Sequence, residues 1–412
     1  MPTSVSLRWF AVSVFILSST LNYLDRNLLN TLAPLLMAEF HLNQTGFGWL
    51  VSAFSAVYAV SALLTGWALD RFGVNRSIFA AVGWWSAAAI GSGLTRGFAG
   101  LVACRSALGI GESAGVSAVG KLNAIYLKPE ERALGAALNQ IGLSLGAALA
   151  GFWGVRMAAA HGWRWPFVIA GVCGFAWLPL WWLVSRLIPA QFREAELASG
   201  QERRSKPSFS ILRDRNLLLL VLANLLWMGS YSLWFNWTTL YLTHVHHVSL
   251  KRSADYVWIP PLVSNAGGFF GGWLSLRWAK GKADPIPARR RAVWVSAVCS
   301  LVTLLLPFAA DVRWATALIS ASFFFVLAGS SNIYTLPVDI YGAQRSGMAL
   351  AALTCSYGLL TTLISPLIGY LSDHQLYTQV VWLVTLPLIL SALVLQGLRT
   401  PREEPLERDR QN

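Results

Sequence analysis

Apolar segments long enough to cross a lipid bilayer recur along the whole chain. A membrane-spanning helix needs about 20 mostly apolar residues, because the hydrocarbon core of a bilayer is about 30 Å thick. The segments form two sets of six, which predicts an all-α membrane protein with twelve transmembrane helices in two pseudo-symmetric six-helix bundles. They lie at about 9–37, 46–68, 77–95, 98–121, 132–156, 164–187, 216–242, 254–279, 289–309, 312–335, 346–371 and 376–398.

The composition agrees with a membrane protein and argues against a nucleic-acid-binding protein. The chain is 55% hydrophobic and only 12% charged, whereas soluble domains contain roughly 25% charged residues. Its net charge of +13 would suit a nucleic-acid partner. However, no segment outside the apolar ones is large enough to form a soluble binding domain. We therefore expect a lipid bilayer, and no nucleic acid, as the surroundings of the chain.

The distribution of basic residues predicts the orientation and the domain boundaries. With both termini in the cytoplasm, most of the 32 Lys and Arg residues fall in inner segments, in agreement with the positive-inside rule. We predict a first bundle at 1–187, a cytoplasmic linker at 188–215, a second bundle at 216–398 and a cytoplasmic tail at 399–412. The outer segments hold only six basic residues: Arg96, Arg156, Arg164, Lys251, Arg252 and Arg313.

Residues 101–121 are apolar overall but contain Arg105 and Glu112. Charges inside a span are costly, so they are rare and predict a functional site. Seven residues separate the two, which places them on nearly the same helix face. The alternative is a buried ion pair that only fixes helix packing. Lys121 lies about 180° away from Glu112 around the helix, where snorkelling toward the interface explains it equally well, and its role stays open.

The first span also carries charges, at Asp25 and Arg26. Asn22 and Asn30 lie four residues on either side of Arg26, and Tyr23 precedes it by three, so they form a polar stripe on one face. A guanidinium binds a carboxylate bidentately, which suits an anion site in a low dielectric. Burial and a neighbouring Arg act in opposite directions on a carboxyl group, which leaves it titratable by small rearrangements. The asparagines could equally join helices.

A loop motif follows the second span, with the sequence GWALDRFGVNR at 66–76. Its glycine permits a tight turn, and its carboxylate can pair with Arg or with a helix N-terminus and hold two helices in one state. The second half has a partial copy, Gly271, Ser275 and Arg277, that lacks the acid. This motif resembles the signature of the major facilitator superfamily (MFS). We expect a gating loop made of Gly66, Asp70, Arg71, Gly73 and Arg76.

The resemblance extends over nearly the whole chain and is strongest to the anion:cation symporter family, within it to the hexuronate (sugar-acid) transporters. It rests on LNYLDRNLLNTLAPLLMAEF (21–40), CRSALGIGES (104–113), HGWRWPFVIAG (161–171), GGWLS (271–275) and YTLPVDIY (334–341). The resemblance implies the MFS fold and proton-coupled uptake of a small organic anion. It also implies that Asp25 and Glu112 carry protons, that Arg26 and Arg105 bind the substrate carboxylate or hold these two acids, and that Tyr23 contacts substrate.

Three further spans contribute candidates for the substrate site. Gln140 in the fifth span stands where that family often has asparagine, and Asn332 in the tenth matches a family asparagine. Trp234, Asn236 and Trp237 form an aromatic and polar group in the seventh span. Aromatic faces stack on sugar rings, but aromatic residues also line membrane interfaces, and the sequence leaves both explanations open.

The sequence gives little support for hydrolase activity or for a metal site. Residues 111–115 fit the G-x-S-x-G pattern of hydrolases, but that pattern requires a strand-to-helix turn, and here it lies in an apolar span. His244, His246 and His247 have no carboxylate or cysteine nearby before Asp255. We expect no enzyme activity, no cofactor and no metal.

The sequence therefore predicts a monomeric, multi-pass secondary transporter of the cell membrane, the inner membrane if the source is bacterial. It would carry a small organic anion, such as a hexuronate or another sugar acid, together with protons. One alternative is a proton-coupled exporter of drugs or metabolites. Another is a membrane sensor that binds its ligand without translocating it.

Overall fold

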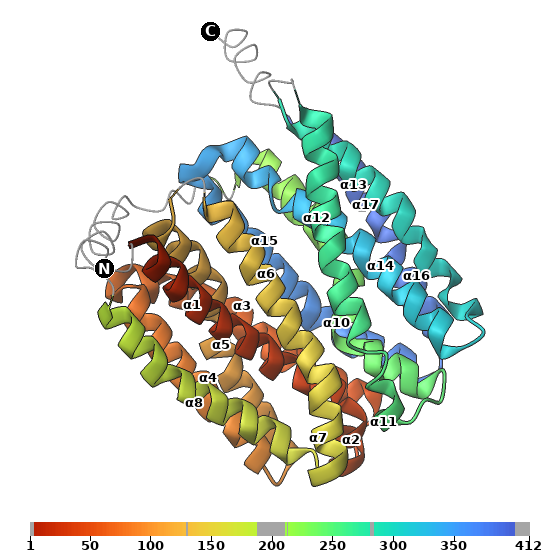
Figure 1. The fold of residues 1–412 in the computed structure, drawn as a ribbon. Coiled ribbons are helices and arrows are strands. Elements are labelled where there is room, and N and C mark those ends of the chain that lie inside the picture. The colour runs from red at the N-terminus through yellow and green to blue at the C-terminus, as the bar shows by residue number, and fades with distance from the viewer. Residues whose placement is uncertain (1–3, 129–130, 188–210, 212, 281–283, 400–412) are drawn as a thin grey trace. The chain divides into compact units, whose positions relative to one another are not determined.

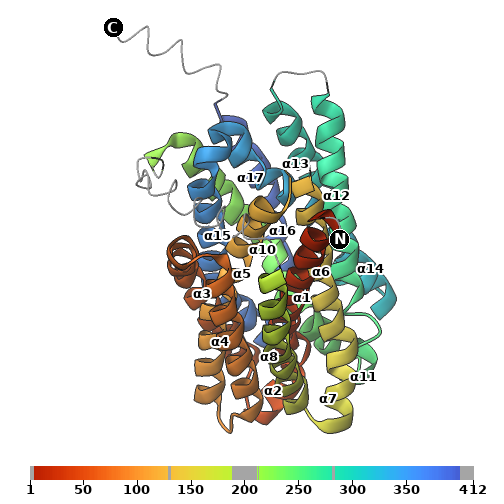
Figure 2. The ribbon, with the colours of Figure 1, turned by 60° about the vertical axis from the view of Figure 1, so that its left-hand side comes forward.

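The described residues form helices as their regular secondary structure. The structure, a computed structural model, describes residues 4–128, 131–187, 211, 213–280 and 284–399, none of which lies in a β-strand (Figures 1 and 2). Most of the predicted linker and nearly all of the predicted tail lie outside these residues. The helices of the first half are α1 (Ser4–Thr31), α2 (Ala33–Glu39), α3 (Gln44–Phe72), α4 (Val74–Leu94), α5 (Phe98–Tyr126), α6 (Arg132–Leu149), a π-helical turn (Ala150–Gly154), α7 (Val155–His161) and α8 (Arg164–Leu187).

The second half continues the same pattern. Its helices are α10 (Arg215–His244), α11 (Leu250–Ser253), α12 (Ile259–Ala279), α13 (Ile286–Ser300) with a 3-10 extension (Leu301–Phe308), α14 (Val312–Ile333), α15 (Leu336–Asp373), α16 (Tyr377–Thr385) and α17 (Pro387–Val394) with a 3-10 turn (Leu395–Gly397). Within α15, Gly342 has a φ of 70°, which breaks the helix into two parts.

Ten helical stretches of the described residues are long and apolar enough to cross a membrane. Helices α5 and α12 are not among them, although both coincide with predicted spans. Arg105, Glu112 and Lys121 lower the hydropathy of α5, and α12 is rich in Gly and Pro. A multi-pass, all-α membrane fold is therefore confirmed, whereas the number of twelve spans stays a prediction.

Several helix ends follow from local sequence. The Asn43 side chain accepts a hydrogen bond from the Gly46 amide at 2.8 Å and caps α3. Asp311 caps α14 in the same way. The predicted first span, 9–37, is interrupted near Leu32, and a proline stands in the first turn of α2, where it needs no amide donor. The eighth span begins at Ile259 rather than at 254, again with proline in its first turn.

The chain divides into two compact units. Unit 1 comprises residues 1–206 and 239–258, and unit 2 comprises 207–238 and 259–412. Residues 239–258, which the sequence analysis assigns to the second bundle, thus belong to unit 1 in this division.

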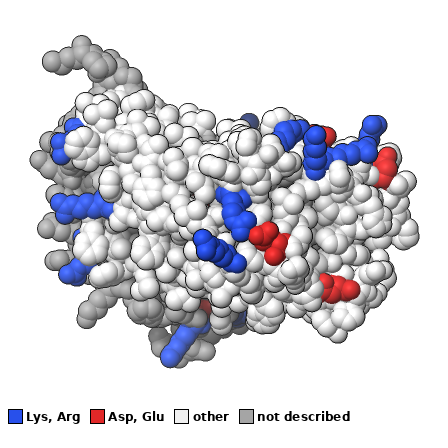
Figure 3. Space-filling view, turned by 90° about the horizontal axis from the view of Figure 1, so that it is seen from below, with Lys and Arg blue, Asp and Glu red and all other residues white. Residues whose placement is uncertain are grey.

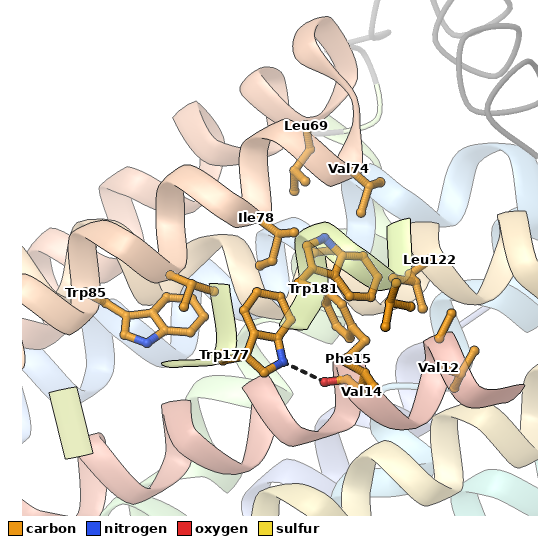
Figure 4. Close-up of a cluster of buried hydrophobic side chains, with 14 of the residues drawn as sticks. Val12, Val14, Phe15, Leu69, Val74, Ile78, Trp85, Leu122, Trp177 and Trp181 are labelled. Atoms are coloured by element: carbon orange, nitrogen blue, oxygen red, sulfur yellow. Dashed lines mark hydrogen bonds between the residues drawn. The ribbon is translucent and has the colours of Figure 1, made fainter. Parts of the chain in front are cut away.

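Three buried tryptophans, Trp85, Trp177 and Trp181, lie in the core of unit 1, where α1, α4 and α8 meet (Figure 4). Trp177 and Trp181 of α8 stack with ring centroids 5.3 Å apart. The Trp177 indole Nε1 donates to the Val14 carbonyl oxygen of α1 at 2.7 Å. This bond satisfies the only polar atom of a buried indole. Helix α1 is therefore held in a fixed position against α8.

Glycines permit a close contact between α12 and α14 in unit 2. A Cβ on Gly267 would lie 2.0 Å from the Phe324 carbonyl oxygen, and a Cβ on Gly271 would lie 2.1 Å from that of Ala328. Only glycine permits this approach of two backbones.

Candidate functional site

Helix α5 carries two of the predicted site residues and packs tightly inside unit 1. A Cβ on Gly109 would lie 3.0 Å from the Phe54 carbonyl oxygen of α3, and one on Gly111 would lie 3.0 Å from the Ala81 carbonyl oxygen of α4. These glycines allow α5 to approach both neighbours. Glu112 follows directly and is therefore held at a fixed position.

Arg26 of α1 and Glu112 of α5 form a buried ion pair. The Arg26 Nε donates to Glu112 Oε2 at 3.1 Å. The Glu112 side chain is 0% exposed and that of Arg26 is 12% exposed. The residue bound to Glu112 is thus Arg26, from a different helix, although Arg105 shares the α5 face with Glu112. Breaking a buried pair by removing one partner typically costs about 3–5 kcal/mol.

Arg105 of α5 also contacts α1, at Asp25, the residue before Arg26. Its Nη1 donates to the backbone carbonyl oxygen of Asp25 at 3.3 Å. Neither carboxylate oxygen of Asp25 has a hydrogen-bond partner among the described residues, although the side chain is buried. Asp25 interacts electrostatically with both Glu112 and Arg105. Buried polar groups are nearly always paired, so an unpaired carboxyl group indicates a functional role. We call Asp25, Arg26, Arg105 and Glu112 the charge cluster.

Three aromatic rings surround the Arg26 guanidinium. Its Cζ lies 5.2 Å from the ring centroid of Tyr23, 5.1 Å from that of Phe54 and 4.6 Å from that of Tyr58. These distances are typical of cation–π contacts, which stabilise a partly desolvated cation. Phe54 lies in addition 5.6 Å from the Cζ of Arg105.

Tyr23 was predicted from the sequence, whereas Phe54 and Tyr58 were not. They lie four residues apart on α3, with stacked rings 5.8 Å apart. Helical spacing within an apolar span is also what packing residues show, so their contact with Arg26 could not be read from the pattern. The phenol of Tyr58, a polar group within an apolar span, was the one available signal.

Gln140 of α6 is exposed. Helix α6 packs on α1 through Gly142 and Gly146, where a Cβ on Gly146 would lie 2.2 Å from the Thr20 carbonyl oxygen. Gln140 is therefore on a helix that contacts α1 closely. Its role in substrate binding stays a prediction.

The predicted site residues of unit 2 take part in contacts between and within helices. The Trp234 indole donates to the Ser322 hydroxyl of α14 at 2.8 Å. The Asn332 amide donates to the carbonyl oxygens of Gly271, at 3.0 Å, and Ala328, at 2.9 Å. Both side chains are buried. Asn332 thus joins α14 to α12 at their closest approach.

Asn236 and Trp237 are buried as well. The Asn236 amide donates to the Ser232 carbonyl oxygen at 2.9 Å, one turn earlier on α10. A more accessible aromatic group lies nearby in sequence, where Tyr231 stacks on Phe235 with centroids 5.5 Å apart. Its edge-on neighbours are Phe323 and Tyr357.

The predicted gating loop is the short connection between α3 and α4. Gly73 has a φ of 83° and ψ of 162°, which only glycine adopts without strain. The side chains of Arg71 and Arg76 are exposed. The side chain of Asp70 lies outside the described set, and Gly66 lies within α3.

In unit 2, an acid from elsewhere in the chain meets the incomplete copy of this motif. Arg289 of α13 donates through Nη1 to the Ser275 hydroxyl at 2.9 Å and through Nε to Asp339 Oδ2 at 3.0 Å. Asp339 stands in the first turn of α15. It therefore supplies a carboxylate beside the position where the second copy has serine.

Comparisons with known proteins identify the family of the chain. The chain is 26% identical over 384 residues to the hexuronate transporter of Escherichia coli (strain K12), covering 89% of this chain and 88% of the relative. It is 26% identical over 308 residues to the galacturonate transporter of Dickeya chrysanthemi, covering 71% and 88%. The resemblance to hexuronate transporters is thus confirmed.

Solved structures share the fold. A D-xylose–proton symporter superposes with a TM-score of 0.73 at 16% identity, covering 95% of this chain and 98% of that one. A bacterial homologue of the lysosomal transporter Spinster, inward-facing and unoccupied, superposes with a TM-score of 0.70 at 17% identity and 95% coverage of both chains. The family model of the Major Facilitator Superfamily matches residues 15–336. The chain belongs to the Major Facilitator Superfamily.

Proposed function

We propose that this transporter takes up a small organic anion, most suitably a hexuronate or related sugar acid, by symport with protons. The observation that carries the proposal is the Arg26–Glu112 pair, which lies beside the unpaired carboxyl group of Asp25. The names of the relatives, hexuronate and galacturonate transporters, support the substrate class.

Arg26 is the proposed anchor of the substrate carboxylate. A guanidinium has five N–H donors and stays charged when desolvated, so it can hold a carboxylate bidentately. Tyr23 and Tyr58 place an aromatic face and a hydroxyl group next to it, which suits the apolar face and the hydroxyls of a sugar acid. Gln140, Trp234, Asn236, Trp237 and Asn332 are proposed as further contributors. Those that hydrogen-bond neighbouring helices here would have to exchange these bonds for substrate.

Charge balance supplies the reason for proton coupling. The charge cluster holds two acids and two bases and is therefore neutral when all four groups are ionised. A substrate anion adds a negative charge, which is costly in a low dielectric. Protonation of Asp25 or Glu112 restores neutrality. Anion binding and proton binding therefore favour each other.

Glu112 couples the two events because it shares Arg26 with the substrate. A protonated Glu112 no longer competes as an anion for the guanidinium, so the substrate carboxylate can take its place. Loss of the proton would restore the Arg26–Glu112 pair and expel the substrate. Asp25, next to Arg105, provides a second protonation site.

The orientation follows the basic residues. We place both termini in the cytoplasm and the chain in the cell membrane as a monomer. Reporter fusions after residue 412 and within 245–249 test this topology. A cytoplasmic reporter should be active at the first position and inactive at the second, and the reverse pattern would refute the orientation.

Transport by purified protein in liposomes tests the function. With D-galacturonate as the probe, an inward proton gradient should drive accumulation above the external concentration, and a protonophore should abolish it. Arg26→Gln should remove uptake, whereas an exporter of apolar compounds would tolerate it. Binding without counterflow would identify a sensor instead, and accumulation that ignores the protonophore would refute symport.

A further inference from the structure

The same pair of residues recurs near the C-terminal ends of three helices. A tryptophan is followed four residues later by an arginine whose guanidinium lies over the indole ring. Trp182 and Arg186 of α8 are 3.8 Å apart, measured from Cζ to ring centroid. The corresponding distance is 5.5 Å for Trp67 and Arg71 of α3, and 5.8 Å for Trp273 and Arg277 of α12. We call these the Trp–Arg pairs.

The rings of all three pairs face outward. Trp67 is 56% exposed, Trp182 is 48% exposed and Trp273 is 54% exposed. Large apolar neighbours are exposed beside them, including Leu183 and Leu276. Such surfaces on membrane-spanning helices contact hydrocarbon. The arginine lies in the last turn of each helix. The end of a membrane-spanning helix is expected at the headgroup region.

Within the part of the chain that the structure describes, no acidic side chain balances the positive charge of these arginines. No carboxylate of the described residues lies within ion-pair distance of Arg71, Arg186 or Arg277. At the opposite end of α8, by contrast, Arg164 pairs with Glu39 at 2.9 Å. On the face that Figure 3 shows, acidic side chains lie beside basic ones near the middle, whereas several basic side chains at the left have no acidic side chain drawn beside them. The Trp–Arg pairs therefore offer an unmatched cation next to an exposed indole.

We propose that the Trp–Arg pairs are binding sites for anionic phospholipids. The guanidinium binds the lipid phosphate bidentately, the indole lies at the level of the glycerol backbone, and the neighbouring leucines contact the acyl chains. Free phosphate would leave the indole and the leucines uncovered, so the ligand is a lipid. Under the orientation proposed above, all three sites lie in the cytoplasmic leaflet, whose surface is negatively charged.

Native mass spectrometry of the purified full-length protein tests this proposal through lipid retention, a measurement independent of transport. The protein is titrated with dioleoylphosphatidylglycerol and, separately, with dioleoylphosphatidylcholine. The variant Arg186→Gln/Arg277→Gln removes two sites and spares the predicted gating loop. Its matched control, Arg96→Gln/Arg291→Gln, removes the same charge from two exposed arginines.

Phosphatidylglycerol should be retained in preference to phosphatidylcholine, and excess inorganic phosphate should not displace it. The first variant should weaken its binding about fivefold per site, and the control should not. Trp182→Leu/Trp273→Leu should also reduce retention although the charge is kept. An equal loss of lipid retention in the control variant would show that the effect depends only on net charge and would refute the Trp–Arg pairs as lipid sites. Unchanged retention in either site variant would refute the Trp–Arg pairs as lipid sites.

Discussion

Arg26 and Glu112 are 86 residues apart in sequence and form an ion pair 3.1 Å long between α1 and α5. Arg105, on the same face of α5 as Glu112, instead contacts the backbone of Asp25. Each arginine thus links the two helices at a different level. This interlocked arrangement places four charged residues in one apolar unit, and it is the basis of the proposed link between substrate binding and protonation.

Replacing Arg26 with lysine should weaken binding of D-galacturonate by about ten- to a hundredfold. A lysine keeps the charge but loses the fork that pairs with a carboxylate, and a charge-assisted hydrogen bond contributes about 1.5–3 kcal/mol. Ligand-induced thermal stabilisation of the purified protein measures the change. The control is Arg132→Lys, which changes an exposed arginine on α6. Equal affinity in wild type and Arg26→Lys would refute the anchor role.

Replacing Tyr58 with leucine should reduce affinity for the same ligand several-fold. The phenol ring contacts the Arg26 guanidinium, and a cation–π contact contributes about 0.5–2 kcal/mol. Phe79→Leu, a half-exposed aromatic residue on α4, should have no effect on affinity. An equal loss in both variants, measured by titration calorimetry, would contradict the assignment.

Alanine substitutions at the adjacent glycines Gly271 and Gly272 are expected to change the thermal stability differently. Alanine at 271 places a Cβ 2.1 Å from the Ala328 carbonyl oxygen, whereas at 272 nothing lies within 4 Å. Overpacking of this kind costs about 1–3 kcal/mol. Gly271→Ala should therefore lower the thermal midpoint followed by tryptophan fluorescence, and Gly272→Ala should leave it unchanged or raise it. A reversed order would contradict the close packing of α12 on α14.

Gly73→Ala should destabilise the loop between α3 and α4. The φ of 83° at this position disfavours any residue with a Cβ, at a cost of about 1–2 kcal/mol. Gly66→Ala, in the same motif but within α3 and with open space around it, should be slightly stabilising. If thermal midpoints of the two variants coincide, the backbone argument for Gly73 is wrong.

The chain's pattern of apolar segments was sufficient to predict helices at all twelve places, because length and hydropathy dominate in a bilayer. It could not predict the interruption after Thr31 or the later start of α12, which depend on local backbone geometry near prolines. Asp25, Arg26, Arg105 and Glu112 were recognisable because charges are rare inside spans. The pairing of these residues could not be predicted, because it depends on the relative rotation and depth of α1 and α5. The same limit applies to Asn332. From the sequence, a polar residue in a span that binds substrate cannot be distinguished from one that binds a neighbouring helix.

Transport by the Glu112→Gln variant, compared in two modes, tests the coupling mechanism most directly. Counterflow of labelled D-galacturonate needs no proton gradient, whereas accumulation does. The variant carries an uncharged side chain that cannot release a proton. We predict that Glu112→Gln retains counterflow and loses accumulation driven by an inward proton gradient. Undiminished gradient-driven accumulation in this variant would contradict the account.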